Sequence, residues 1–243
     1  MPDENQSKQN PISKLGAVVL CGGKSSRLGI DKSRLDFNGR TFLEQVVAQV
    51  RQVCSSVVVV GNNDLSCHRL PGDVLIARDE ASDKGPLEGI RVGLKRLSMP
   101  SRAAETQPPD ASNQVKQVGC EFAFVTSCDV PLLKSELVRF LFEQLEGHSA
   151  IVPVQEERIF GMTAIYRTQL HVEIANRIKA GSLRVSDLAS ALGARCIEAE
   201  SLRAADSDLD SLTNINSVAD YRELLERLEL TCPADLAKSI GLV

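Results

Sequence analysis

The sequence predicts an α/β protein: a single domain built on a three-layer, doubly wound and mostly parallel sheet. Short, nearly continuous apolar runs alternate along the chain with segments whose apolar residues recur at the helical period, as in strand–helix–strand units. In addition, glycine-rich and polar motifs follow directly after the apolar runs. Because sheets of this class bind ligands at the carboxyl ends of their strands, the motifs and the elements predict the same architecture.

The first expected strand covers residues 15–21, which are almost all apolar, as in a strand buried on both faces. Segment 41–53 is expected to be helical, because its apolar residues have helical spacing and Thr41 with Glu44 forms a capping-box pattern. A Gly-Pro pair precedes a further helix at 87–97. The remaining expected elements are strands at 57–60, 74–77, 121–127, 150–154 and 162–166, and helices at 134–145, 170–178, 185–192 and 218–228.

Three segments are expected to differ from the rest of the domain, which spans residues 15–230. Residues 1–14 are polar and are expected to form a flexible leader. Residues 98–119 contain three prolines and no aromatic residue, which predicts a mobile insertion within the domain. Residues 231–243 are expected to be a tail with one short amphipathic turn.

Composition narrows the class of protein. The 243 residues carry a net charge of −4 and only 4% aromatic residues, which disfavours a nucleic-acid-binding surface. No apolar run approaches the length of a membrane span, and the amino terminus is polar, so we expect a cytoplasmic protein. The seven cysteines form no Cys-x-x-Cys pair, which disfavours a zinc site and a disulfide framework.

A glycine-rich, basic loop follows the first expected strand. Gly22 and Gly23 permit backbone angles that let amide groups face an anion, and four cations follow them, Lys24, Arg27, Lys32 and Arg34. The Walker A pattern fails, because Val18 stands where that motif needs its first glycine. The three spaced glycines of dinucleotide-binding loops are missing as well. The loop therefore predicts a polyphosphate site of another kind, although paired glycines can also form a simple strand-to-helix turn.

Residues 20–32 read Leu-x-Gly-Gly-x-Ser-x-Arg-x-Gly-x-Asp-Lys, and this string resembles nucleotidyltransferases of the molybdenum cofactor guanylyltransferase type. Further matching motifs follow in the family's order over residues 15–222: the strand end at 57–62, Asp79 with Gly-Pro-Leu-x-Gly at 85–89, Cys-Asp-x-Pro at 128–131, and Asn-x-Asn-Ser at 214–217. Each motif alone is weak, but their common order is specific.

The resemblance implies a Rossmann-like nucleotidyltransferase fold that transfers GMP from GTP to the terminal phosphate of molybdopterin or molybdenum cofactor, with release of pyrophosphate. It implies Mg²⁺, or Mn²⁺, bound by Asp129, and proteins of molybdenum cofactor assembly as possible partners. Lys32, Arg27 and Asp129 are the expected catalytic residues. The expected nucleotide-binding residues are Leu20, Cys21, Gly22, Gly23, Lys32, Asn62, Asp79 and Asp129, with Lys24, Asn214 and Asn216 as further candidates.

Each candidate also has a plain structural interpretation. Asp129 could begin a turn or cap a helix near Pro131, and a Lys or Arg in a loop is usually a solvated charge. Asn62 could belong to a Gly-Asn-Asn turn, and Asp79 could be a solvated loop residue. Asn214 and Asn216 could cap the helix expected from residue 218.

The expected chemistry needs no protein base. A phosphate monoester has a second pKa near 6, so at neutral pH it reaches the site mostly as a dianion and is already nucleophilic. The three histidines, His68, His148 and His171, lie in no motif and are most simply surface or structural residues.

One departure from the family concerns the acceptor. The family often has a His-Pro pair before the strand that reads Phe-Gly-Met-Thr-Ala-Ile-Tyr at 160–166, and this chain has none. Glu156, Glu157 and Arg158 precede that segment and could shape the acceptor pocket or form an exposed loop. Alternative functions are a cytidylyltransferase for the same pterin, a sugar-phosphate nucleotidyltransferase, and a nucleotide-binding regulator without catalysis.

Overall fold

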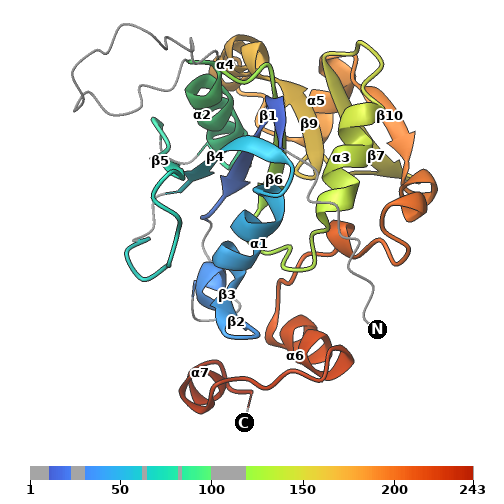
Figure 1. Cartoon of the computed structure of the whole chain (residues 1–243). Helices are drawn as coiled ribbons and strands as arrows, with labels where there is room; N and C mark the ends of the chain where they lie inside the picture. The colour runs from blue at the N-terminus through green and yellow to red at the C-terminus, as the bar shows by residue number, and fades with distance from the viewer. Residues whose placement is uncertain (1–10, 23–30, 62–64, 82–83, 100–118, 243) are drawn as a thin grey trace, which may run out of the picture.

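A twisted sheet with helices on both faces forms the body of the described chain (Figure 1). The structure is a computed structural model that describes residues 11–22, 31–61, 65–81, 84–99 and 119–242. The strand order is β10-β7-β9-β6-β1-β4-β5, and β8 pairs with β7. The strands are β1 (Ile12–Leu20), β4 (Cys54–Val60), β5 (Leu75–Ala77), β6 (Phe122–Ser127), β7 (Ala150–Gln155), β8 (Arg158–Ile159), β9 (Ala164–Arg167) and β10 (Arg195–Glu198).

The centre of the sheet is parallel. Strand β1 pairs in parallel with β4 on one side and with β6 on the other, so that Leu20 lies opposite both Val60 and Ser127. Strand β9 is antiparallel to β6 and to β7, whereas β10 is parallel to β7. The predicted doubly wound, mostly parallel sheet is confirmed, and the carboxyl ends of β1, β4 and β6 meet at one edge.

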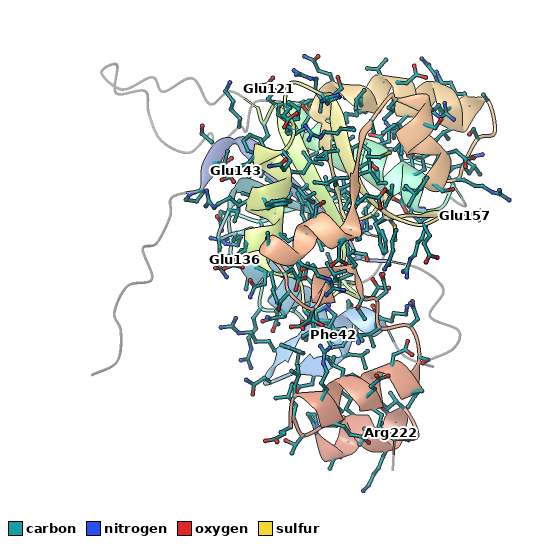
Figure 2. All side chains as sticks on the ribbon, turned by 90° about the vertical axis from the view of Figure 1, so that its right-hand side faces the viewer. Phe42, Glu121, Glu136, Glu143, Glu157 and Arg222 are labelled. Carbon is teal, nitrogen blue, oxygen red and sulfur yellow. The ribbon has the colours of Figure 1, made fainter. Side chains whose placement is uncertain are left out.

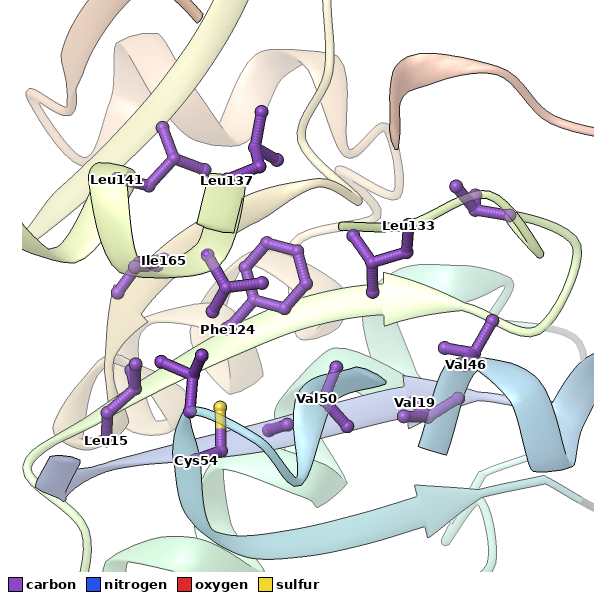
Figure 3. Close-up of a cluster of buried hydrophobic side chains, with 14 of the residues drawn as sticks. Leu15, Val19, Val46, Val50, Cys54, Phe124, Leu133, Leu137, Leu141 and Ile165 are labelled. Carbon is purple, nitrogen blue, oxygen red and sulfur yellow. The ribbon is translucent and has the colours of Figure 1, made fainter. Parts of the chain in front are cut away.

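Helices α1 (Phe42–Val50) and α3 (Ser135–Glu143) cover one face of the sheet. Ala17 and Val19 of β1 point to this face because side chains alternate along a strand. Figure 3 shows Val46 and Val50 of α1 and Leu137 and Leu141 of α3 packed against the central strands. This cluster is the larger part of the hydrophobic core.

Helices α2 (Pro86–Ser98), α4 (His171–Lys179) and α5 (Ser186–Ala191) cover the opposite face, onto which Val18 and Leu20 of β1 point. Helix α2 approaches β1 closely at Gly93, where a Cβ atom would lie 2.4 Å from Val18 Cγ1. A larger residue at this position would push the helix away from the sheet.

A third cluster lies below the sheet, between the chain's last helices and the segment that follows the glycine loop (Figure 1). Helices α6 (Val218–Arg227) and α7 (Ala234–Ser239) pack on the hairpin of β2 (Asp36–Phe37) and β3 (Arg40–Thr41). The rings of Phe42 and Tyr221 lie 5.7 Å apart, and Tyr221 Oη donates to Asp36 O at 2.8 Å. Figure 2 shows Phe42 at this junction.

The expected helices and long strands are confirmed with small shifts at their ends, and α7 is the short turn expected in the tail. The β2–β3 hairpin, β8, β10 and four 3₁₀ turns were not expected; the turns are η1 (Lys32–Arg34), η2 (Thr168–Leu170), η3 (Ala199–Ala204) and η4 (Asp210–Leu212). Strand β1 begins at Ile12, within the segment expected as a leader. No helix in the described part of the chain is long and apolar enough to cross a bilayer.

The predictions for residues 1–10 and 100–118 fall outside the described residues. The two ends of the expected insertion are described, and they adjoin. A Cβ atom on Gly119 would lie 2.5 Å from Ser98 O, and Cys120 N donates to Leu97 O at 2.9 Å. Residues 98 and 119, the described residues nearest the two ends of the expected insertion, therefore lie next to each other at the end of α2.

Candidate functional site

Lys32 lies on the single turn η1, between two anchored residues. The N-cap of this turn is Asp31, whose carboxylate accepts a hydrogen bond from Ser33 N at 3.0 Å. Ser33 and Leu35 are fully buried, whereas the Lys32 side chain is 20% exposed. The local sequence therefore directs the lysine out of the buried turn toward the strand ends.

Asp129 follows β6 and faces Lys32. The two charged groups lie 3.3 Å apart, from Lys32 Nζ to Asp129 Oδ2. The other carboxylate oxygen, Oδ1, accepts hydrogen bonds from Ser127 Oγ and from Asn214 Nδ2, the latter at 2.9 Å. These two donors orient the carboxylate and leave Oδ2 as the oxygen that faces the lysine. The alternative that Asp129 caps a helix is wrong, since the N-cap of α3 is Lys134.

Asn214 and Asn216 complete this cluster from the carboxyl-terminal half of the chain. Asn216 Oδ1 accepts a hydrogen bond from Lys32 Nζ at 2.6 Å, and Ile215 N donates to Asp129 O at 2.8 Å. The capping alternative for the two asparagines is wrong, because Ser217 is the N-cap of α6 and forms a capping box with Asp220. Both asparagine side chains instead contact the Lys32–Asp129 pair.

Asp220 supports the loop that carries Asn216. Its Oδ2 accepts hydrogen bonds from the backbone of Asn216 at 2.7 Å and of Ser217 at 3.0 Å. Burial alone would raise the pKa of Asp220, but these hydrogen bonds and the nearby Lys32 charge hold that pKa below its ordinary value. The Asp220 carboxylate therefore stays charged and keeps the loop in place at neutral pH.

Leu20, Cys21 and Gly22 lie at the end of β1, beside the end of β4. Cys21 N donates to Val60 O at 2.7 Å, and a Cβ atom on Gly61 would lie only 1.7 Å from Cys21 O. Gly61 is thus required where the two strand ends approach each other. This close approach places the start of the glycine loop at the edge of the sheet that also carries Asp129.

Two thiols lie at the strand ends, Cys21 after β1 and Cys128 after β6. A hydrogen bond between them lowers the pKa of Cys21 and raises that of Cys128, and a hydrogen bond from Ser33 lowers the Cys21 pKa further against the effect of burial. Both residues are buried. The two thiols at the strand ends are therefore connected to the Lys32 turn through Ser33.

Asp79 lies beyond β5, on the side of the site that faces α2. A Cβ atom on Gly89 of α2 would lie 3.6 Å from Asp79 Oδ1 and 2.9 Å from Leu20 Cδ2. The next residue, Glu80, accepts a hydrogen bond from Arg91 at 2.6 Å. Asp79 is therefore held near the end of β1 by a loop that is tied to α2.

A cavity of about 430 Å³ lies beside the Asp129 cluster and shares Asn214 with it. Arg158 and Arg184 bring positive charge to its lining, and Phe160 and Met162 bring apolar surface. The Arg158 guanidinium lies over the Phe160 ring, 4.4 Å from its centroid. The segment in which the family's His-Pro pair is missing thus lines this cavity.

Several predictions cannot be placed. Gly23, Lys24, Arg27 and Asn62 lie outside the described residues. Of the remaining candidates, Lys32, Asp129, Asn214 and Asn216 are in mutual contact, while Leu20, Cys21, Gly22 and Asp79 lie along the same edge of the sheet.

Sequence reasoning missed Ser127, which orients Asp129. The available signal was its position as the last residue of the expected strand 121–127, two residues before Asp129.

The donor atoms around Asp129 suit a hard cation that also binds phosphate. Among the described residues, no three His, Cys, Asp or Glu side chains gather in a way that could enclose a metal ion. Mg²⁺ does not need such a cage, because it usually keeps several waters and binds one or two carboxylates together with substrate phosphates. Asp129 Oδ2 and Asn216 Oδ1 are oxygen ligands of this kind, and both already contact the positive charge of Lys32.

Comparison with known proteins places the chain in a family. The model of the MobA-like NTP transferase domain matches residues 17–196. The chain belongs to this family. It is therefore a nucleotidyltransferase, as the motifs of the glycine loop and the strand ends predicted.

Relatives cover nearly the whole chain. A protein of Desulfosudis oleivorans named molybdenum cofactor guanylyltransferase is 29% identical over 219 residues, which are 89% of this chain and 95% of the relative. A probable molybdenum cofactor guanylyltransferase of Mycobacterium bovis is 32% identical over 84% of this chain and 90% of the relative.

Among solved structures, the molybdopterin-guanine dinucleotide biosynthesis protein A of Archaeoglobus fulgidus superposes with a TM-score of 0.67 at 20% identity, over 88% of this chain and 98% of that one. The nucleotidyltransferase fold is confirmed.

Proposed function

We propose that the protein transfers GMP from GTP to the terminal phosphate of molybdopterin and releases pyrophosphate. The observation that carries this proposal is the position of Asn214. Its amide donates to Asp129, and the same residue lines the cavity that contains Arg158 and Arg184. A nucleotide bound along the strand ends and an anionic acceptor bound in the cavity would therefore meet at Asp129.

The choice of guanine has two supports. The relatives of similar length are named guanylyltransferases, and they align over most of the chain. In addition, Gly22 and Gly23 stand where the resembled family's guanine users have paired glycines and its cytosine users tend to have Ala-Gly.

In the proposed reaction, an oxygen of the acceptor's phosphate dianion attacks the α-phosphorus of GTP. The new bond joins this oxygen to the α-phosphorus, and the bond between the α-phosphorus and the bridging oxygen breaks. The pyrophosphate leaves with the electron pair of that bond. Since the acceptor arrives largely deprotonated, no side chain has to remove a proton, and stabilisation of charge is the main task of the protein.

Lys32 is proposed to stabilise the charge that develops on the phosphates during transfer. Its ammonium is held between Asp129 and Asn216, so it is oriented before the nucleotide binds. Arg27, which lies outside the described residues, is proposed to assist from the glycine loop. Asp79 and the backbone at Leu20, Cys21 and Gly22 are proposed to contact the nucleoside.

Asp129 is proposed to hold Mg²⁺ through Oδ2, with Asn216 as a neighbouring oxygen ligand. When bound, the ion neutralises phosphate charge and polarises the phosphoryl oxygens. Ser127 and Asn214 would keep the carboxylate oriented toward the ion, because both donate to its other oxygen. Lys32, which contacts Asp129 in this structure, would then exchange that contact for one with the phosphate oxygens.

The cavity is proposed to bind the acceptor. Its volume of about 430 Å³ lies within the range of small-molecule sites, roughly 300 to 1,000 Å³. Arg158 and Arg184 are proposed to bind anionic groups of the acceptor, and Phe160 with Met162 its ring system.

The test is a pyrophosphate-release assay on the purified chain with molybdopterin, Mg²⁺ and each of GTP, CTP, ATP and UTP. We expect release with GTP, and none without the acceptor. Preference for CTP would indicate a cytidylyltransferase. Release when a sugar phosphate replaces molybdopterin as the acceptor would indicate a sugar-phosphate nucleotidyltransferase. Binding of a nucleotide without release for any acceptor would favour a non-catalytic regulator.

A further inference from the structure

His68 is a buried residue whose two ring nitrogens are both engaged. Nδ1 lies 2.9 Å from Thr41 Oγ1, and Nε2 lies 3.2 Å from Ser33 Oγ. His68 is only 8% exposed, and Ser33 is fully buried. A buried ring with a fixed partner on each side is held in one orientation, so it also fixes the segments that it joins.

His68 joins the turn that carries Lys32 to the start of α1. Ser33 follows Lys32 in the turn η1, and Thr41 is the N-cap of α1. His68 itself comes from the connection between β4 and β5, which starts at the strand end beside Cys21. The neighbouring Arg69 N donates to Glu44 Oε1 at 2.6 Å, which gives this connection a second tie to α1.

One set of hydrogen-bond directions satisfies all four groups. Thr41 Oγ1 accepts from Glu44 N at 3.3 Å, so its hydroxyl hydrogen can be donated to His68 Nδ1. Ser33 Oγ lies 3.2 Å from His68 Nε2 and can accept its hydrogen. The neutral imidazole with its hydrogen on Nε2 fits this chain of bonds.

The lysine turn needs anchors of this kind. It is a single 3₁₀ turn of three residues, and such turns have few and poorly aligned internal hydrogen bonds. On its carboxyl side, Leu35 is buried in the cluster under α6 and α7. At its centre, Ser33 is joined through its side chain to His68 and through its backbone N–H to the N-cap Asp31.

We propose that His68 is a positioning residue for Lys32, and that it couples the segment after β4 to the lysine turn. The inference rests on the proposed role of Lys32 in nucleotide transfer. The His68 hydrogen bond fixes Ser33, and thereby the backbone from which the Lys32 side chain reaches Asp129 and Asn216. Without it, the ammonium group would spend less time between these two residues, and turnover would fall because charge stabilisation depends on position.

The test measures how accessible the amine of Lys32 is to a chemical reagent. The purified, folded protein is treated with a small amount of an acetylating ester, and acetylation of individual lysines is measured by mass spectrometry. Lys134 is an internal reference, because it is also a partly exposed lysine paired with an aspartate but lies in another cluster. The quantity of interest is the acetylation rate of Lys32 divided by that of Lys134.

Two substitutions separate the two hydrogen bonds of His68. In His68→Gln, the amide extends about as far as Nε2 and can still donate to Ser33. In His68→Asn, the amide extends about as far as Nδ1 and can bond only to Thr41. We expect His68→Asn and His68→Ala to raise the acetylation ratio roughly two- to tenfold, the range that loss of one ordinary hydrogen bond allows, and His68→Gln to stay near the wild type. A role in stability alone predicts no such difference between Gln and Asn.

Two controls exclude general effects. His148→Ala removes an exposed histidine, whose Nδ1 contacts Leu145 O at 3.0 Å, and leaves the ratio unchanged. Val138→Ala weakens the core under α3 and lowers the melting temperature without changing the ratio.

An unchanged ratio in folded His68→Ala and His68→Asn would overturn the proposal. Turnover gives the second measurement: kcat falls in His68→Asn, KM for GTP changes little, and His68→Gln restores kcat. A changed ratio in a protein that turns over no nucleotide would support the positioning role and reject the proposed function, so the two failures are distinguishable.

Discussion

Two lysine–aspartate pairs of this chain join the same residue types but differ in their surroundings. Lys134 and Asp206 form a short pair of 2.6 Å, and the Asp206 side chain is sealed from solvent. Lys32 and Asp129 lie 3.3 Å apart, both are partly exposed, and the lysine is shared with Asn216. The two pairs therefore differ at the aspartate: Asp206 is fully buried, whereas 15% of the Asp129 side chain is exposed at the strand ends.

The neighbours of the two aspartates explain this difference. Asp206 Oδ2 accepts a hydrogen bond from Ser211 N at 2.8 Å, and Lys134 N donates to Ser211 Oγ at 2.9 Å. The lysine, the aspartate and the serine therefore contact one another, which fixes the segment before Asn214 to the start of α3. Asp129 has a serine neighbour too, but its remaining oxygen faces the strand ends. This Oδ2 contacts Lys32 at 3.3 Å, compared with 2.6 Å in the Lys134–Asp206 pair, so it is the less tightly held oxygen of the two pairs.

The largest expected effect separates the two aspartates by activity. Asp129→Asn keeps the shape and the hydrogen bond from Ser127 but removes the charge, so we expect turnover to fall by about 10² to 10³ or more. The melting temperature should stay close to that of the wild type. Initial rates and thermal unfolding measure both. Exposed Asp208→Asn is the matched control and should behave as wild type; a fully active Asp129→Asn would remove Asp129 from the site.

Asp206→Asn should show the reverse pattern. Asp206 is a buried carboxylate, whereas its partner Lys134 is 35% exposed and stays solvated when the charge of Asp206 is removed. We therefore expect a loss of about 1 to 2 kcal/mol in the free energy of unfolding, mainly from the weakened hydrogen bonds of the buried group. Urea titration measures this loss. The folded fraction should retain its turnover. A large loss of kcat with unchanged stability would show that the two pairs are not separate in function.

The contrast between the pairs also marks what could be predicted from sequence. Lys32, Asp129, Asn214 and Asn216 were predicted because their motifs resemble those of a nucleotidyltransferase family. For Asp129, parallel topology added a reason, since it places the end of its strand beside the glycine loop's strand. The closure of the Asp206 pair could not be predicted, because it depends on the packing of an irregular segment against the start of α3.

Smaller elements also divide into those that the sequence indicates and those that it does not. The β2–β3 hairpin was missed although Asn38 and Gly39 have positive φ angles of 53° and 79°, and an Asn-Gly pair is the strongest short signal for such a turn. Strand β10 offered no comparable signal, because it is a short edge strand with a charged residue at each end. His68 had no motif, and its burial depends on contacts that only the fold creates.

Acid should reduce the stability that the Lys134–Asp206 pair contributes, because it protonates Asp206. Burial alone would raise the pKa of Asp206, but the hydrogen bonds from Lys134 and Ser211 hold it below the ordinary value of 3.8. A group whose pKa is lower in the folded state stabilises the fold above its unfolded pKa, and this stabilisation is lost as pH falls through the folded pKa. The stability gap between wild type and Asp206→Asn should therefore be complete near pH 6 and should shrink below about pH 4. Urea titrations at several pH values measure it, and a constant gap would contradict the assignment.

The smallest expected effects come from replacing the serine beside each aspartate. One replacement should lower stability alone, and the other should lower activity alone. Ser211→Ala removes the acceptor of Lys134 N and should cost about 1 kcal/mol in the free energy of unfolding, with kcat unchanged. Ser127→Ala removes one of two donors to Asp129 Oδ1, so it should lower kcat about two- to tenfold with little change in stability.

Ser207→Ala, at an exposed serine, controls for loss of a hydroxyl. Suppose instead that Ser211→Ala and Ser127→Ala each lost both stability and activity. The two pairs would then be coupled through the segment before Asn214. The Lys134–Asp206 pair would in that case belong to the site, because it would fix Asn214, which links Asp129 to the cavity.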